Sequence, residues 1–257
     1  MFRGLEVLTA APDYPARLVS IFDVDHDVSV AEFQALAQAA IDEVLAVGKT
    51  PVVVGGSGLY LRAALTELRL PPPPATGVRE RWEEVYDADP ARAHELLAEL
   101  DAPAATRVHP NDRRRVVRAL ELAESGATLA GDALWTAPLR HPTLLVGLDL
   151  PQDVLEDRIR ARAAWMLEQG VVAEAQAAVA RGPSRAAGKV MGLVDFAELG
   201  ADDAREALVA NNLRLARYQR KWLRRLPELV PVDANRPPAT VADEILAAAR
   251  ERGMLSA

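Results

Sequence analysis

The stretch VVVGGSGLY, residues 52–60, decides the fold class, because glycines there join a run of valines to a helical pattern. A run of β-branched residues without polar alternation is typical of a parallel strand that is covered on both faces. Open α/β sheets bind ligands beyond the carboxyl ends of their strands, where the amides of the next helix point outward. The stretch therefore predicts a strand at 51–54 and a ligand-facing turn at 55–57, although an ordinary turn with Ser57 as a helix cap fits it equally well.

The sequence on both sides of this stretch continues the α/β pattern. A β-branched run, RLVSIF at 17–22, precedes a helix that we expect to begin at Ser29 and to end at Gly48. Ser29 is a suitable cap, and Glu32 three residues later completes a capping box. A third apolar run, TLLVGLDL at 143–150, predicts another buried strand. This order of strands and helices predicts a parallel sheet.

A run of four prolines, residues 71–74, predicts a stiff connector that leaves the sheet. Helical patterns follow it, and we interpret residues 75–138 as a helical insertion into a core domain made of residues 1–74 and 139–257. The remainder of the core domain is expected to be helical, over about 151–181, 201–226 and 241–252.

The composition limits the classes of protein to which the chain could belong. Its 257 residues include no cysteine, which excludes disulfides, thiolate catalysis and thiolate metal sites. No apolar run is long enough to cross a bilayer, and we expect a monomeric, cytoplasmic protein with no membrane partner. The net charge of −7 disfavours a nucleic-acid partner, but the arginines are clustered, and a local basic face can still hold an anionic ligand.

The clearest arginine cluster lies in HPNDRRRVVRALE, residues 109–121. Asn111 or Asp112 is expected to cap a helix on which Arg114, Arg115 and Arg118 share one face, because they lie three or four residues apart. That face could bind phosphates or stacked bases. The alternative is a solvated face with salt bridges, since Arg118 and Glu121 also have pairing spacing, and charge alone favours this alternative.

Three other patterns do not predict a metal site. The acidic run at 23–27 starts like a calcium loop, but Val28 stands where the turn glycine belongs. The acidic segment at 202–206 has no second copy in the chain with which it could share a metal ion, and acids there are typical of the first turn of a helix. The four histidines are scattered and form no ligand pair at helical spacing. We therefore expect no metal held by protein side chains alone.

Taken in order, five segments of the chain resemble tRNA dimethylallyltransferases: GGSGLYLRA at 55–63, PPATGVRER at 73–81, HPNDRRR at 109–115, GKVMG at 188–192 and RYQRKWLR at 217–224. The resemblance spans nearly the whole chain. It implies a P-loop NTPase-like parallel sheet with a helical tRNA-binding insertion. The implied activity is transfer of a dimethylallyl group from dimethylallyl diphosphate to the exocyclic amine of the adenine just 3′ of the anticodon.

The resemblance also implies roles for individual residues. Ser57 replaces a threonine of the family and keeps the hydroxyl that contacts the flipped-out adenine, so it is the implied catalytic residue. Gly55, Gly56 and Lys189 are implied to bind the diphosphate, with Mg²⁺ as the cofactor. The residues implied to bind the anticodon stem-loop of tRNA are Arg79, Arg114, Arg115, Val116, Val117 and Arg118.

The chain also departs from the family pattern. The family opens with a strand, a GxTxxGKT phosphate loop and a DSxQ segment, whereas the match here begins at Met1, just after these. We therefore expect the first strand and the phosphate loop to be missing, with neighbouring strand edges left unpaired. Two alternatives remain open, namely a non-catalytic tRNA-binding remnant and a phosphotransferase similar to nucleotide kinases.

Overall fold

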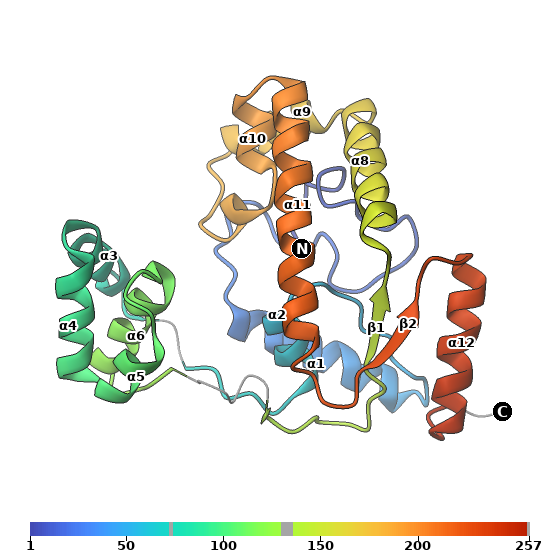
Figure 1. Cartoon of the computed structure of the whole chain (residues 1–257), viewed down its shortest axis with the longest axis horizontal. Helices are drawn as coiled ribbons and strands as arrows, with labels where there is room; N and C mark the ends of the chain where they lie inside the picture. The colour runs from blue at the N-terminus through green and yellow to red at the C-terminus, as the bar shows by residue number, and fades with distance from the viewer. Residues whose placement is uncertain (72–73, 130–135, 256–257) are drawn as a thin grey trace. The chain divides into compact units, whose positions relative to one another are not determined.

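The computed structural model describes residues 1–71, 74–129 and 136–255, so two prolines of the expected connector, at 72–73, lie outside the described residues. The chain divides into two compact units (Figure 1). Residues 1–65 and 139–257 form the core unit, and residues 66–138 form the insertion unit. Each unit is described by itself below.

The core unit combines a small parallel sheet with helices, so the fold class is α/β. Its strands β1 (Val146–Asp149) and β2 (Val230–Asp233) pair in parallel, with Val146 opposite Val230 and Asp149 opposite Asp233. Figure 1 shows the two strands side by side, with the C-terminal helix next to β2. The helices of this unit are α1 (Val30–Ala46), α2 (Gly58–Leu65), α8 (Gln152–Glu168), α9 (Val171–Ala180), the 3₁₀ turn η1 (Ala187–Lys189), α10 (Leu193–Glu198), α11 (Ala201–Leu223) and α12 (Pro238–Glu251).

Two of the three expected strands do not form among the described residues. In the run at 17–22, Leu18 and Ser20 have φ angles of 62° and 48°, which are incompatible with extended backbone. Phe22 forms only a single parallel bridge, with Phe2. Residues 51–54 pair with no described strand, and the Val52 and Val54 side chains are each 85% exposed. A strand needs a neighbour for its ladder, and high β propensity does not replace one.

Local signals at helix ends agree better with the structure. The Ser29 hydroxyl accepts a hydrogen bond of 3.0 Å from the backbone N–H of Glu32, and α1 ends before Gly48, whose φ is 70°. The Glu32 carboxylate contacts Nε2 of His26 at 2.9 Å. The expected long helix after Pro151 is divided into α8 and α9 at Gly170, whose φ of 84° belongs to the left-handed region.

The main core of this unit joins the N-terminal segment to helices α8 to α11. Phe2 and Leu5 are buried in the same cluster as Ile159, Leu193 and Phe196. The Glu174 carboxylate on α9 accepts hydrogen bonds from the backbone N–H groups of Val7 at 2.9 Å and Leu8 at 2.8 Å. The N-terminal segment is thus held both by apolar burial and by a carboxylate that satisfies its backbone donors.

The insertion unit is helical throughout its described elements. Its helices are α3 (Val78–Ala88), α4 (Pro90–Leu100), α5 (Ala102–Arg107) and α6 (Arg113–Glu124). Tyr86, Leu97, Val116 and Leu120 lie in their common core. Helix α5 was not expected from the sequence, although Asp101 caps it by accepting a hydrogen bond of 2.9 Å from the N–H of Ala104. None of the helices that the structure describes is both long and apolar enough to cross a membrane.

Two glycines with nearly the same φ angle allow a test of the core packing. A Cβ added at Gly170 (φ 84°) meets nothing within 4 Å, whereas one at Gly192 (φ 86°) lies 3.1 Å from Leu208 and 3.2 Å from Leu8. We predict that Gly170→Ala lowers the free energy of unfolding by about 1–2 kcal/mol, the cost of a left-handed L-residue. Gly192→Ala should cost about 1–3 kcal/mol more, because buried side chains must move.

Urea unfolding of both variants measures the difference between these costs. Equal losses of stability at the two positions would show that the contacts around Gly192 do not constrain the core.

Candidate functional site

The glycine turn, residues 55–57, forms the exposed entrance to helix α2. Gly55, Gly56 and Ser57 are all exposed, and the Ser57 carbonyl accepts the first helical hydrogen bond, 2.9 Å from the N–H of Leu61. The free amides at the start of such a helix carry partial positive charge and favour an anion. The sequence therefore placed this turn correctly at the start of a helix, although no described strand leads into it.

A glutamine on helix α11 holds the glycine turn in place. Nε2 of Gln219 donates a hydrogen bond of 2.9 Å to the carbonyl of Gly56. A Cβ added at Gly56 would lie 2.3 Å from the same Nε2, so a side chain there would displace the end of Gln219 from this position. The sequence does not predict this contact. Gln219 lies in the segment RYQRKWLR, but nothing near it in the sequence connects it to a turn 163 positions away.

The amino end of α6 carries the arginine cluster in the insertion unit. Asp112 caps this helix, accepting a hydrogen bond of 3.2 Å from the N–H of Arg115. Arg113 donates to both Asp87 oxygens, at 2.7 and 2.6 Å, and this contact lowers the pKa of Asp87. Arg115 lies 3.5 Å from Asp112, whereas the exposed Arg114 has no ion pair with another described residue.

Two arginines from different helices meet on one buried carboxylate. The Glu121 side chain is fully buried, while Arg79 and Arg118 are 30% and 25% exposed. Arg79 on α3 donates from Nε and, at 2.9 Å, from Nη2 to the two carboxylate oxygens, and Arg118 Nη1 donates at 2.8 Å. The structure thus brings together two of the arginines that were expected to bind RNA.

The titration of this cluster reflects its hydrogen bonds. Burial alone acts to raise the pKa of Glu121, but the hydrogen bonds from Arg79 and Arg118 outweigh it, and the pKa lies below its ordinary value. The pKa of Arg79 is raised, chiefly by its hydrogen bond to Glu121. Both shifts favour the charged forms of Glu121 and Arg79.

The remaining expected site residues lie in other surroundings. The side chains of Val116 and Val117 are buried in the core of the insertion unit, where they fix the position of α6. Lys189 is exposed at the end of η1, which packs against α10 in the core unit. The glycine turn and the arginine cluster belong to different units.

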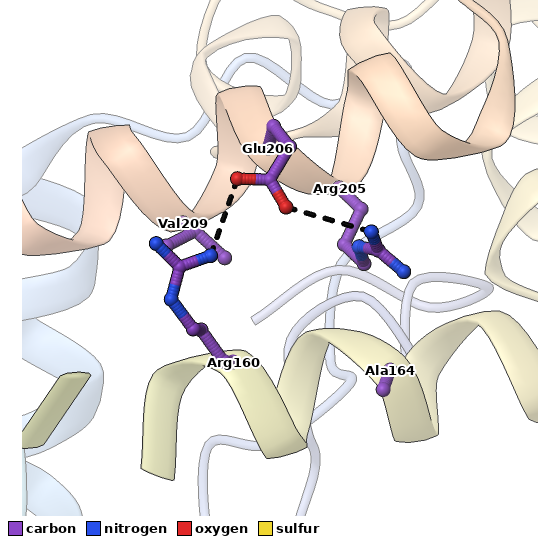
Figure 2. A pocket seen from close by; sticks show the side chains of 5 residues that line it. All are labelled: Arg160, Ala164, Arg205, Glu206 and Val209. Carbon is purple, nitrogen blue, oxygen red and sulfur yellow. Dashed lines mark hydrogen bonds and ion pairs between the residues drawn. The ribbon is translucent and has the colours of Figure 1, made fainter. Parts of the chain in front are cut away.

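A separate cavity of about 190 Å³ lies between α8 and α11. Figure 2 shows Glu206 between Arg160 and Arg205, with ion pairs of 3.2 and 3.5 Å. Arg160 also pairs with Glu156 at 2.9 Å, and Arg205 with Asp202 at 3.4 Å. Three carboxylates therefore accompany two guanidiniums, and these described side chains give the cavity no excess positive charge for an anion.

The fold and these sites define an α/β protein with an exposed glycine turn and an arginine-bearing helical insertion. A family model described as IPP transferase matches residues 1–226, and the chain belongs to this family. It is 38% identical to a tRNA dimethylallyltransferase of Kineococcus radiotolerans in an alignment 262 positions long, gaps included, which covers 96% of this chain and 82% of that protein. A tRNA dimethylallyltransferase of Corynebacterium jeikeium is 35% identical, over 96% of this chain and 84% of that protein.

Solved structures show the same fold. A full-length tRNA isopentenylpyrophosphate transferase from Bacillus halodurans is 28% identical with a TM-score of 0.64, over 98% of this chain and 85% of that one. A eukaryotic dimethylallyltransferase acting on tRNA is 21% identical with a TM-score of 0.76, over 97% of this chain and 69% of that one. At that identity the second likeness concerns the fold alone.

The lowered pKa of Glu121 predicts an acid-dependent loss of stability. A carboxyl group whose pKa is lower in the folded state stabilises the protein above its unfolded pKa, about 4.3, and this contribution disappears as the pH falls through the folded pKa. Protonated Glu121 resembles glutamine. The difference in unfolding free energy between the wild type and Glu121→Gln should therefore be largest above about pH 5 and should shrink towards pH 3.

Urea titrations at several pH values measure this difference. Glu124→Gln is the matched control, because Glu124 is a more exposed carboxylate on the same helix that also pairs with an arginine of α3. Its difference should be smaller at every pH. A difference for Glu121→Gln that stays constant across the titration would contradict the pairing.

Proposed function

We propose that this chain transfers a dimethylallyl group from dimethylallyl diphosphate to the exocyclic amine of the adenine just 3′ of the anticodon in tRNA. The observation that carries the proposal is the exposed glycine turn, which leads into α2 and is held by Gln219, in a member of the IPP transferase family. In the transfer, the bond between the dimethylallyl carbon and the diphosphate oxygen breaks, a carbon–nitrogen bond forms, and the amine loses a proton.

The core unit is proposed to hold the reacting groups. Ser57 stands at the exposed start of α2, where its hydroxyl can hydrogen-bond to the edge of an unstacked adenine. The amides of Gly55 and Gly56 are proposed to approach the diphosphate, because glycine lets the backbone come close to a ligand. Lys189 is proposed as a further charge for the diphosphate, in keeping with its exposed position.

We propose that residues 75–138, which lie in the insertion unit, are a tRNA-binding domain. This domain is proposed to bind the anticodon stem-loop. Arg79, Arg114, Arg115 and Arg118 are exposed or partly exposed, and guanidiniums bind phosphate through charge-assisted hydrogen bonds. Val116 and Val117 are proposed to contribute by anchoring α6 from the core. A protein with net charge −7 needs such a local basic surface to hold a polyanion.

A magnesium ion is the cofactor that the resemblance implies. No three His, Asp or Glu side chains of the described residues gather closely enough to hold a metal ion. The described residues therefore do not fit a metal held by the protein alone. The proposed tRNA substrate places the protein in the cytoplasm, and we propose that it acts as a monomer.

The proposed function predicts loss of transfer when the Ser57 hydroxyl is removed. Ser57→Ala should lower kcat/KM about 3- to 10-fold, the order expected for one lost hydrogen bond to the base. Ser57→Thr keeps a hydroxyl at the same place and should stay within about twofold of the wild type. The measurement is transfer from radiolabelled dimethylallyl diphosphate to an anticodon stem-loop RNA.

The outcomes of this assay separate the candidate functions. RNA binding by the wild type without any transfer would favour a non-catalytic tRNA-binding protein, and phosphorylation of a nucleoside monophosphate would favour a kinase. Equal activities of the wild type and Ser57→Ala would remove Ser57 from the proposed site.

The proposed contacts between arginines of the insertion unit and RNA phosphates predict a specific change in RNA affinity. Arg114→Ala should raise the Kd for the stem-loop about 2- to 5-fold and should reduce the dependence of log Kd on log salt by about one phosphate contact. Arg92→Ala is the control, because Arg92 is also a half-exposed arginine of the insertion unit but already pairs with Glu95 and Glu99. Equal effects of the two substitutions would show that Arg114 is a solvated surface residue and does not contact the RNA.

A further inference from the structure

We propose that Glu121 is a positioning residue for RNA binding: its buried carboxylate holds the guanidiniums of Arg79 and Arg118 side by side, so that they contact the RNA backbone as one unit. This inference rests on the proposed function, because it concerns the same arginine surface. It adds to that function a residue that never touches the RNA itself, since the Glu121 side chain is fully buried.

The geometry of the cluster fixes both arginines. Arg79 uses two of its nitrogens, Nε and Nη2, on the two oxygens of Glu121, which sets the plane of its guanidinium. Arg118 approaches from the preceding turn of the same helix and donates from Nη1 to Oε2 at 2.8 Å. The two guanidiniums therefore share one oxygen of Glu121, and neither can rotate without breaking a charge-assisted hydrogen bond.

The charge of the cluster distinguishes it from a simple link between helices. A neighbouring link, Arg81 of α3 with Glu124 of α6, pairs one cation with one anion. The Glu121 cluster instead holds two cations on one anion, and both cations remain partly exposed, at 30% and 25%. The three groups together keep one net positive charge at the surface. The same contacts also tie α3 to α6, so the cluster links the helices and presents two guanidiniums at the surface.

The acidic surroundings make orientation important. Glu80 and Glu83 on α3 act on Arg79 at longer range, so two further negative charges lie near the cluster. Attraction of a phosphate must then come from N–H groups that point in a fixed direction, and not from bulk charge. A carboxylate that orients two guanidiniums supplies this direction. The ligand chemistry that fits the pair is a phosphate of the RNA backbone.

The test compares Glu121→Gln with Glu124→Gln in the full chain. Both substitutions remove one negative charge from α6 and weaken the hydrogen bonds of one α6 side chain with α3, so they match in net charge. Only Glu121→Gln should free the guanidiniums of Arg79 and Arg118 from their fixed orientation. We expect Glu121→Gln to raise the Kd for a tRNA anticodon stem-loop about 3- to 10-fold and to reduce the salt dependence by about one phosphate contact. Glu124→Gln should leave the salt dependence unchanged, and its Kd should be equal to or slightly lower than that of the wild type.

The Kd and its salt dependence are measured by fluorescence anisotropy, with circular dichroism to establish that each variant is folded. A merely structural role would lower the melting temperature without changing the number of phosphate contacts. If Glu121→Gln does not fold, the pair Glu121→Asp and Glu124→Asp replaces it, because aspartate keeps the charge but is one methylene too short to hold both arginines. Glu121→Asp should then weaken binding, and Glu124→Asp should not.

The results distinguish this inference from the function on which it rests. A wild-type chain that binds no stem-loop would overturn both. A wild-type chain that binds the RNA, together with equal Kd values and equal salt dependence for the two glutamine variants, would overturn the role of Glu121 alone.

Discussion

A buried carboxylate must have hydrogen-bond donors, and in the insertion unit this requirement organises the pair of arginines Arg79 and Arg118. Glu121 lies on α6 without exposure to solvent, and its donors come from Arg118 on the same helix and Arg79 on α3. Because unpaired burial of the charge is costly, the two helices are held in one register. The positions of two of the arginines that we propose for RNA binding therefore follow from the hydrogen bonds of a single acid.

A comparable constraint acts in the core unit through one amide. Gln219 of α11 donates to the carbonyl of Gly56, and a side chain at that position would displace the end of Gln219. The turn that carries Ser57 is thus fixed from a distant part of the chain. In both units, a polar contact between remote residues positions groups that we propose to contact the RNA.

The sequence predicted what depends on neighbouring residues. The caps Ser29 and Asp112 are correct, because a cap and its amide lie within three residues of one another. The strand at 51–54 is wrong, since a strand depends on a partner, and β2 was missed because Pro231 interrupts its pattern. The pairing of Arg118 with Glu121 was visible from spacing, but the contribution of Arg79 was not, because 42 positions separate it from Glu121.

We propose that the glycine turn of the core unit and the arginine pair of the insertion unit both contribute to binding tRNA. The most direct measurement is photo-crosslinking of the chain to an anticodon stem-loop with a photoreactive group next to the adenine 3′ of the anticodon. The account predicts crosslinks to the peptide that contains Ser57, lost on competition with unlabelled stem-loop. Crosslinks confined to α12, with none near Ser57, would contradict it.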